Sequence, residues 1–381
     1  MDNKKLLILD IAVYALVILV AVFFVVPNLR NGNQTEINNN TEIPEEIKKT
    51  GTTVLSATDE TTETTEDIQP QQANTQLLEA GWIPYWGLDS GYVSLVNNVS
   101  ILEEINPVLY TIDTDGSLKR NPFTEETLRK ILSLCKQKNI RVVPTIGSYV
   151  LENTSALLSS PANIKENIED ILKEIETYGY AGIDLDFETI SASDAINYHT
   201  YLSELKTKLS KEEKILSVTV FPQWGQTIYS THPDTRKAQD YAYINTVADE
   251  VRIMCYDYDT SVIGPLGPTH WIKEVLTYAT KKIDKNKIYL GVHLYAYEWE
   301  DSTPTALTYS SLSNILSSSS ITKYYDDNTG EDSATYKCGE HNCTLYYISP
   351  EGILARRNIA KQYGIKGISY WKLGGEDNLL K

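Results

Sequence analysis

From residue 77 onward, short apolar runs alternate with longer stretches in which apolar residues recur every three or four positions. Apolar runs of this length are typical of buried β-strands, and the wider spacing is typical of helices with one buried face. The runs predict eight strands, at residues 81–86, 107–113, 141–147, 181–188, 216–222, 250–258, 287–297 and 367–374. The region 77–381 therefore alternates strand and helix.

Helix-start signals support this alternation. Ser160 precedes Pro161, a proline suited to a first helical turn, and a stripe of apolar residues follows between positions 164 and 175. Eight strands that alternate with helices predict an α/β fold, a (β/α)8 TIM barrel. A doubly wound open sheet is the alternative, but the sequence lacks the glycine-rich first turn that is typical of that fold.

Residues 299–348 break the rhythm. This stretch is long and rich in Ser, Thr and Tyr, and we expect it to form a small insertion between the seventh and eighth strands. Within it, Cys338 and Cys343 lie close in sequence and predict a local disulfide, provided that the domain is exported. Because His341 alone supplies too few ligands, we expect no metal site here.

Residues 6–26 form an apolar stretch that is broken only by Asp10. A helix of this length would be about 31 Å long, which matches a hydrocarbon core of about 30 Å. A cleaved signal peptide is the alternative, but the apolar run ends at Pro27 without a small-residue cleavage site. We therefore expect a cytoplasmic N-terminus at residues 1–5 and a single-pass anchor in the cell membrane, with the rest of the chain outside. Cleavage would instead give a secreted protein.

The segment 28–76 separates this stretch from the predicted barrel. It is rich in Asn, Thr, Glu and Gln, and its nine acidic and three basic residues give it a net charge of −6. Such a segment buries too little apolar surface to fold, so it predicts a disordered linker.

The whole chain carries a net charge of −17. A surface this acidic repels phosphate backbones, which makes nucleic acid an unsuitable partner. The sequence also lacks the GxxxxGK[ST], GxGxxG, GxSxG and HExxH motifs. Phosphate-binding loops, nucleophile elbows and zinc-protease sites therefore lose their sequence support.

The predicted strand 181–188 carries three acids at alternate positions. Because side chains alternate between the two faces of a strand, Asp184, Asp186 and Glu188 face one way, into the barrel. Burying carboxylates without partners costs several kcal/mol for each ion. Catalytic groups of such barrels lie at the carboxyl ends of the strands, so these three acids predict a catalytic site there.

The segment that contains these acids, GIDLDFE, closely resembles the DxxDxDxE signature of family 18 glycoside hydrolases, the chitinase-like barrels. Residues 254–257 (MCYD) resemble the family's MxYD motif, and residues 367–377 (GISYWKLGGED) resemble its eighth strand. The run that begins at Ser349 is similar to the bacterial cell-wall and spore-cortex branch. The resemblance covers about residues 77–381, and many members also carry an insertion before the last strand.

Two positions depart from the family pattern. Ala181 stands where the signature begins with Asp, and residues 145–148 (TIGS) stand where the third strand carries SxGG. The first Asp is the signature position farthest from the reaction, so we expect activity to survive its loss. Ser148 changes the wall of the site beside the third strand.

The resemblance implies a role for each matching residue. Glu188 would be the general acid, Asp186 would orient the acetamido group of the sugar, and Asp184 would share a proton with Asp186. Tyr256 would donate a hydrogen bond to the acetamido oxygen. Asp257 would bind sugar hydroxyls or the acetamido group, and Trp371 would stack beneath the sugar ring. Apart from the resemblance, Trp86 and Trp224 lie at strand ends, where we expect them to line flanking subsites, and we expect Met254 to pack beside the substrate site.

The implied activity is hydrolysis of β-linked N-acetylglucosamine polymers by a retaining, substrate-assisted route that needs no cofactor. Peptidoglycan is the first expected substrate and chitin the second. A non-catalytic, glycan-binding protein of the envelope is the alternative from another class. Lectin-type members usually replace the acid, whereas this chain keeps Glu188.

Overall fold

The computed structural model describes residues 76–225, 231–300, 303–317, 321–376 and 378–381. Residues Thr75–Lys381 form one compact unit. The predicted anchor at 6–26 and nearly all of the predicted linker lie outside the described residues, so both stay predictions. Within the described ranges, no helix has both the length and the apolar character needed to cross a membrane.

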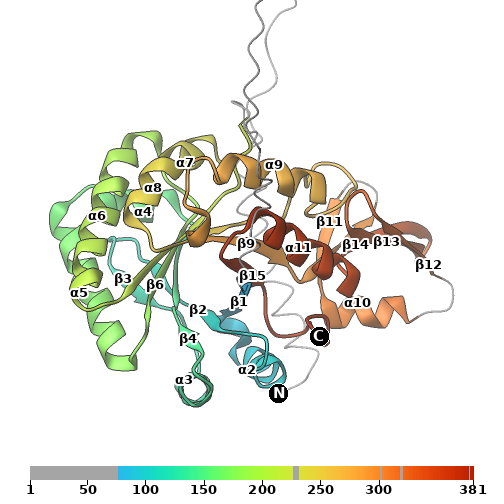
Figure 1. Cartoon of the computed structure of the whole chain (residues 1–381), viewed down its shortest axis with the longest axis horizontal. Helices are drawn as coiled ribbons and strands as arrows, with labels where there is room; N and C mark the ends of the chain where they lie inside the picture. Colours follow the sequence, from blue (N-terminus) through green and yellow to red (C-terminus); the bar gives the residue numbers. More distant parts are fainter. Residues whose placement is uncertain (1–75, 226–230, 301–302, 318–320, 377) are drawn as a thin grey trace, which may run out of the picture. The chain divides into compact units, whose positions relative to one another are not determined.

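Eight parallel strands close into a barrel (Figure 1). In order around the ring they are β1 (Leu78–Pro84), β2 (Glu104–Ile112), β5 (Thr145–Ser148), β6 (Gly182–Phe187), β7 (Ile215–Val220), β8 (Glu250–Ile253), β9 (Ile288–His293) and β15 (Gly367–Trp371). The ring closes because β1 pairs with both β2 and β15. Two short strands, β3 (Leu118–Arg120) and β4 (Arg141–Val142), also pair with β2. The predicted (β/α)8 barrel is confirmed.

Helices connect the barrel strands and cover the outside of the ring (Figure 1). They are α2 (Leu88–Asn98), α3 (Glu125–Lys138), α4 (Leu151–Leu158), α5 (Pro161–Tyr178), α6 (Ala195–Lys211), α7 (Pro233–Ala238), α8 (Tyr241–Val247), α9 (Thr269–Ala279) and α11 (Pro350–Tyr363). The start of α5 follows its sequence signal, since the Ser160 side chain accepts a hydrogen bond from the Asn163 amide and Pro161 occupies the first turn.

The two faces of β6 meet different surroundings. Ile183, Leu185 and Phe187 are buried in the main core, and the Phe187 ring stacks on Tyr201 of α6 with 5.9 Å between centroids. The alternate residues therefore point into the barrel, as the sequence predicts. This register places Asp184 and Asp186 inside the ring.

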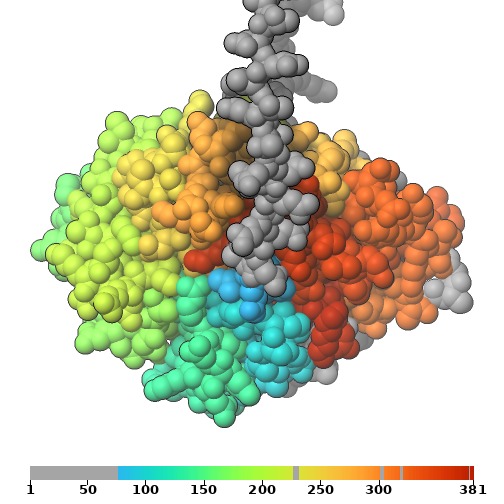
Figure 2. Space-filling model, in the orientation of Figure 1, coloured from blue at the N-terminus to red at the C-terminus, as the bar shows by residue number. Residues whose placement is uncertain are grey.

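A second, antiparallel sheet lies in sequence between β9 and β15, with the strand order β11-β10-β14-β13-β12. Its elements are β10 (Tyr295–Glu300), β11 (Thr303–Thr308), α10 (Tyr309–Leu316), β12 (Thr322–Asp326), β13 (Glu331–Cys338) and β14 (His341–Tyr347). The sheet has its own small core, which includes Leu312 and Leu345. In Figure 2 its atoms and those of α10 form the right-hand end of the visible surface.

The Cys338–Cys343 disulfide closes the turn between β13 and β14, with 5.8 Å between the Cα atoms. Cys135 and Cys255 are buried free thiols.

The predicted seventh strand, 287–297, is wrong as one element. Pairing with β8 and β15 stops by His293, and from Tyr295 the chain pairs with β11 and β14 of the second sheet instead. The second sheet therefore begins before residue 299. The predicted strand 250–258 is also too long, because β8 ends at Ile253. A continuous apolar run marks burial, but it does not mark which sheet a residue joins.

Candidate active site

Asp184 lies deepest of the three acids and is fully buried. Hydroxyl groups from both neighbouring strands donate to its carboxylate: Thr145 of β5 at 2.9 Å, Ser217 of β7 at 2.6 Å and Thr219 of β7 at 3.0 and 3.1 Å. Three donors satisfy most of the lone pairs of an ionised carboxylate. Asp184 is therefore held firmly in one orientation.

Asp186 is the next inward acid and is poorly satisfied by comparison. Its Oδ1 is buried without a hydrogen-bond partner among the described residues. Burial raises the pKa of Asp186 well above its ordinary value, the nearby charges of Glu188 and Asp184 raise it further, and a hydrogen bond with Tyr149 opposes them. An unpartnered buried oxygen in a partly open site can accept a donor from a bound ligand.

Glu188 follows the last residue of β6, and its backbone amide donates to the Ser148 carbonyl at 2.9 Å. Burial raises the pKa of its carboxyl to about 7, with a further contribution from the charge of Asp257. A carboxyl with this pKa is protonated in about half of the molecules at neutral pH, which suits a general acid.

The residues after β8 turn sharply into the same region. Asp257 has a φ of 55°, in the left-handed region that Asp tolerates better than most residues. Its Oδ1 accepts hydrogen bonds from the hydroxyls of Tyr295 and Tyr297, the latter at 2.8 Å. Both tyrosines belong to β10, so the second sheet holds an acid of the barrel in place.

Tyr256 lies among the acids. Burial raises the pKa of its hydroxyl well above the ordinary value, and the charges of Asp186, Asp257 and Glu188 act in the same direction. Its ring packs edge-on against Tyr295 with 6.4 Å between centroids. A phenol that keeps its proton can donate a hydrogen bond into the site.

Trp371 ends β15 and is half-buried. Its ring meets Trp82 edge-on at 6.1 Å, and it packs against the cluster of Leu266, Tyr295, Tyr297 and Trp299. Met254 is buried just after β8. The mutual charge effects among Glu188, Asp186, Asp184, Tyr256 and Asp257 show that these five residues lie together near the carboxyl ends of the strands. We call this region the barrel mouth.

Trp86 and Trp224 also follow barrel strands. Trp86 meets Tyr85 edge-on at 4.9 Å, and Lys372 lies 6.0 Å from the centre of its ring. Trp224 packs edge-on against Trp271 at 5.7 Å and lines an outer groove with Lys273 and Tyr278. These contacts are with protein groups, and a sugar-binding role for either tryptophan stays a prediction.

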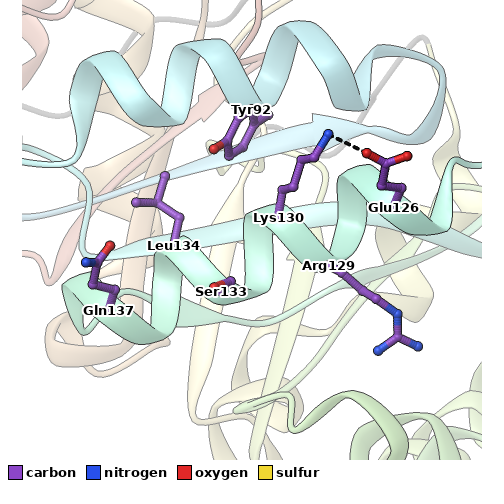
Figure 3. Close-up of a pocket in the computed structure, with 7 residues that line it drawn as sticks. All are labelled: Tyr92, Glu126, Arg129, Lys130, Ser133, Leu134 and Gln137. Carbon is purple, nitrogen blue, oxygen red and sulfur yellow. Dashed lines mark ion pairs between the residues drawn. The ribbon is translucent and has the colours of Figure 1, made fainter.

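Figure 3 shows a different surface groove, of about 430 Å³, between α2 and α3. Tyr92 of α2 faces Leu134 and the Lys130–Glu126 ion pair of α3, whose charged atoms lie 2.7 Å apart. None of the acids of the barrel mouth lines this groove.

Sequence reasoning missed Tyr149. Its ring covers Gly147, where an added methyl group would come within 2.3 Å of the ring. The tyrosine is half-exposed, yet its hydroxyl reaches Asp186. The signal was a tyrosine directly after a strand that faces the acids, but the sequence did not show which way it turns.

Ser148 and Ala181, the two positions that depart from the family pattern, each make a defined hydrogen bond. The Ser148 hydroxyl is hydrogen-bonded to the Thr154 hydroxyl at 2.7 Å, on the side of α4. Ala181 lies at the other end of β6 from Glu188, and its amide donates to the Val142 carbonyl at 2.9 Å. Among the described residues, no group of three or more His, Cys, Asp or Glu side chains has the arrangement of a metal site.

Two relatives place these residues among known proteins. A cortical fragment-lytic enzyme of Bacillus anthracis is 28% identical over 306 residues, which cover 72% of this chain and 67% of that protein. The uncharacterized glycosylase YvbX of Bacillus subtilis is 25% identical over 277 residues, which cover 69% of this chain and 80% of that protein.

Crystal structures share the fold. The spore cortex-lytic enzyme SleL of Bacillus megaterium superposes with a TM-score of 0.70 at 21% identity, covering 80% of this chain and 72% of that one. A chitinase from Chromobacterium violaceum gives a TM-score of 0.73 at 19% identity, covering 80% and 96%. At these identities the structural likeness shows the fold alone.

The family model described as Glycosyl hydrolases family 18 matches residues 81–376, which include all three inward acids, Tyr256 and Trp371. This match spans more than half of the chain. The relatives include spore cortex-lytic proteins, in agreement with the branch that the sequence resembles. The chain therefore belongs to glycosyl hydrolase family 18.

Proposed function

We propose that this protein is a retaining glycosidase that hydrolyses β-linked N-acetylglucosamine bonds in cell-wall peptidoglycan. The family match supports the glycosidase, and the cortical fragment-lytic relative supports a cell-wall substrate. Chitin is the second candidate substrate, because the relatives also include a class V chitinase of Arabidopsis thaliana, 23% identical over 311 residues.

The observation that carries the proposal is the different state of two neighbouring acids. Glu188 has a pKa of about 7, and Asp186 has a raised pKa and a buried oxygen without a partner. The first property supplies a proton near neutral pH, and the second supplies an acceptor for a polar group of the substrate. A core carboxylate would need neither.

In the proposed reaction, Glu188 gives its proton to the glycosidic oxygen while the bond from that oxygen to the anomeric carbon breaks. The acetamido oxygen of the same sugar attacks the anomeric carbon from the opposite face and forms an oxazolinium ion. Asp186 accepts a hydrogen bond from the acetamido nitrogen, and Tyr256 donates one to the acetamido oxygen. Glu188 then takes a proton from a water molecule whose oxygen bonds to the anomeric carbon, while the bond from the acetamido oxygen to that carbon breaks, so the configuration is retained overall.

The test is a digest of purified peptidoglycan and of chitin oligosaccharides, side by side, with the full chain and its Glu188→Gln variant. Mass spectrometry identifies the new reducing ends. We expect the wild type alone to release peptidoglycan fragments that end in N-acetylglucosamine. Release of fragments from chitin alone would show that chitin, and not peptidoglycan, is the substrate.

The same experiment tests the non-catalytic alternative. If both proteins are folded and neither releases product, while both bind the glycan in a pull-down, the protein is a glycan-binding member of its family. Equal activity of the two proteins would overturn the assignment of Glu188.

A further inference from the structure

A charged network fills the barrel at the amino ends of the strands, beneath the three acids. We call this region the barrel floor; its charged residues are Glu104, Arg141, Glu250, Arg252 and Lys366. Arg252 lies at its centre and is fully buried. Its guanidinium pairs with Glu250 at 2.7 Å and with Glu104, and lies 4.5 Å from the centre of the Tyr289 ring.

The other two cations lie at the edge of the floor. Arg141 pairs with Glu104 at 2.7 Å and with Glu250 at 2.9 Å, and Lys366 pairs with Glu250 at 2.8 Å. The floor thus contains three cations and two acids. One positive charge is left over, and the nearest acid above Arg252 is Asp184.

One hydroxyl group joins Arg252 to Asp184. The Arg252 Nε donates to the Ser217 Oγ at 3.0 Å, and that oxygen donates to Asp184 Oδ1 at 2.6 Å. The direct distance from Nε to Oδ1 is 3.8 Å. At such a distance inside a protein, a cation favours the ionised form of a carboxylate strongly.

The charge of Asp184 depends on all the groups that surround it. Neutral donors face it from β5 and β7, Tyr198 of α6 and Tyr149 act on it from a distance, Asp186 is its neighbour on β6, and Arg252 of β8 is the cation. The donors and the cation stabilise the ionised form, whereas the burial of Asp184 and the neighbouring acid Asp186 oppose it.

We propose that Arg252 is a positioning residue for catalysis: acting through Ser217, it keeps Asp184 ionised, so that the proton shared by the two aspartates stays on Asp186. This inference rests on the proposed function, because it concerns the same site. Arg252 contacts no substrate in this scheme. Its charge determines which of the two aspartates, Asp184 or Asp186, carries the shared proton.

The asymmetry of the pair supports the inference. Asp184 has three hydroxyl donors and a cation, whereas Asp186 has Tyr149 and an unpartnered oxygen. The charge of Asp184 in turn helps to raise the pKa of Asp186. The barrel floor therefore influences the pKa of Asp186 indirectly, through the charge of Asp184.

Two matched pairs of variants test this role. Arg252→Met removes the cation that reaches Asp184, and Arg141→Gln removes a floor cation whose ion pairs are with Glu104 and Glu250. Ser217→Ala removes the joining hydroxyl, and Ser369→Ala removes another hydroxyl that accepts from Arg252, at 3.2 Å.

The readout is the pH profile of kcat/KM on peptidoglycan. Without Arg252, no cation of the floor balances a negative charge on Asp184, and a pair that carries two protons is inactive. We expect the acid limb to move up by about one pH unit or more in Arg252→Met, and by less in Ser217→Ala. The limb should stay in place in Arg141→Gln and Ser369→Ala. An unmoved limb in Arg252→Met, or equal shifts in Arg252→Met and Arg141→Gln, would overturn the inference.

A second readout does not depend on hydrolysis. In the full chain labelled with ¹³C at the aspartate carboxyl carbons and held at one fixed pH, the Asp184 signal should lie further toward its protonated position in Arg252→Met than in the wild type and in Arg141→Gln. If the wild type cleaves no glycan, the proposed function fails, and this comparison still decides the role of Arg252. If Arg252→Met does not fold, Arg252→Lys takes its place: it keeps a cation in the floor but lacks the Nε donor to Ser217, so a smaller change in the same direction is expected, and an unchanged signal would overturn the inference.

Discussion

At the barrel floor, Glu250 lies against three cations, whereas at the barrel mouth Glu188 lies near other acids. Although burial opposes it, the charges of Arg252, Arg141 and Lys366 lower the pKa of Glu250 to about 2. Burial and the charge of Asp257 raise the pKa of Glu188 to about 7. Two glutamates inside one barrel thus differ in pKa by about five, because only one of them has counter-ions.

This difference assigns the acids of the barrel floor to stability and the acids of the barrel mouth to chemistry. A buried acid with cations is a fixed charge, and losing it leaves those cations unpaired. A buried acid without them exchanges its proton near neutral pH. Asp184 lies between the two regions, since it accepts hydrogen bonds from the neighbouring strands and lies 3.8 Å from Arg252 of the floor.

The largest expected effect is at the mouth. Glu188→Gln removes the acid and should lower kcat by about 10²- to 10⁴-fold. Because Glu188 lies close to other acids, its neutralisation should leave the thermal midpoint unchanged or raise it. Steady-state kinetics and a thermal melt measure both. A large fall in the midpoint would mean that Glu188 has an unrecognised structural partner, and the contrast with the floor would break.

The next effect is at the floor. Glu250→Gln should lower the free energy of unfolding by about 3 to 5 kcal/mol, because Lys366 loses its partner and Arg252 and Arg141 are left to share Glu104. Urea denaturation at pH 7 measures the loss. The exposed pair in Figure 3 provides the control, since Glu126→Gln should leave the urea midpoint unchanged.

The pH dependence of stability sharpens the same point. Glu250 has a folded pKa of about 2 against an ordinary value of 4.5, so its contribution is complete above pH 4.5 and is lost as the pH falls toward 2. Glu250→Gln should therefore lose less stability than the wild type between pH 5 and pH 3. Parallel curves for the two proteins would contradict the low pKa.

A smaller effect is expected from Tyr149→Phe. The variant loses the hydroxyl that bonds Asp186, and a hydrogen bond between neutral groups is worth about 0.5 to 1.5 kcal/mol, so kcat should fall by up to about tenfold. Tyr92→Phe, in the surface groove between α2 and α3 (Figure 3), is the matched control and should retain full activity. Equal rates for Tyr149→Phe and the wild type would show that the contact with Asp186 does not serve the reaction.

The smallest effect is a displacement of one limb of the pH profile. Asp257→Asn removes a negative charge that raises the pKa of Glu188, so Glu188 should lose its proton at lower pH. The alkaline limb of kcat should move down by up to about one pH unit. Asp259→Asn makes the same charge change at an exposed acid that bonds Ser261, and its limb should not move. An upward displacement in Asp257→Asn would contradict the electrostatic account.

The sequence predicts the floor and the mouth unequally. Asp184, Asp186 and Glu188 could be found because strand alternation is a local property, and the structure keeps that register. Glu250 and Arg252 stand on one face of β8 by the same rule, but their partners Glu104 and Lys366 come from distant strands. No local pattern states that a charge in one strand will find its counter-ion in another.

The division of the run 287–297 is the other failure. Tyr295 and Tyr297 belong to an apolar stretch that reads as one strand, yet the chain changes sheets after His293. The partners of β10 are β11 and β14, and both lie in the stretch that broke the sequence rhythm. The apolar pattern therefore predicts a barrel position for two residues, Tyr295 and Tyr297, that belong to the second sheet and bond Asp257 from there.

The bonds from Tyr295 and Tyr297 to Asp257 bear on how this enzyme could be re-engineered. A designer who exchanged the second sheet for that of another family member, in order to alter the groove for the glycan, would also exchange the supports of an acid beside Glu188. Such a chimera inherits a new proton affinity along with its new surface. Grafts that begin after Tyr297 keep the two hydroxyls with the barrel that uses them.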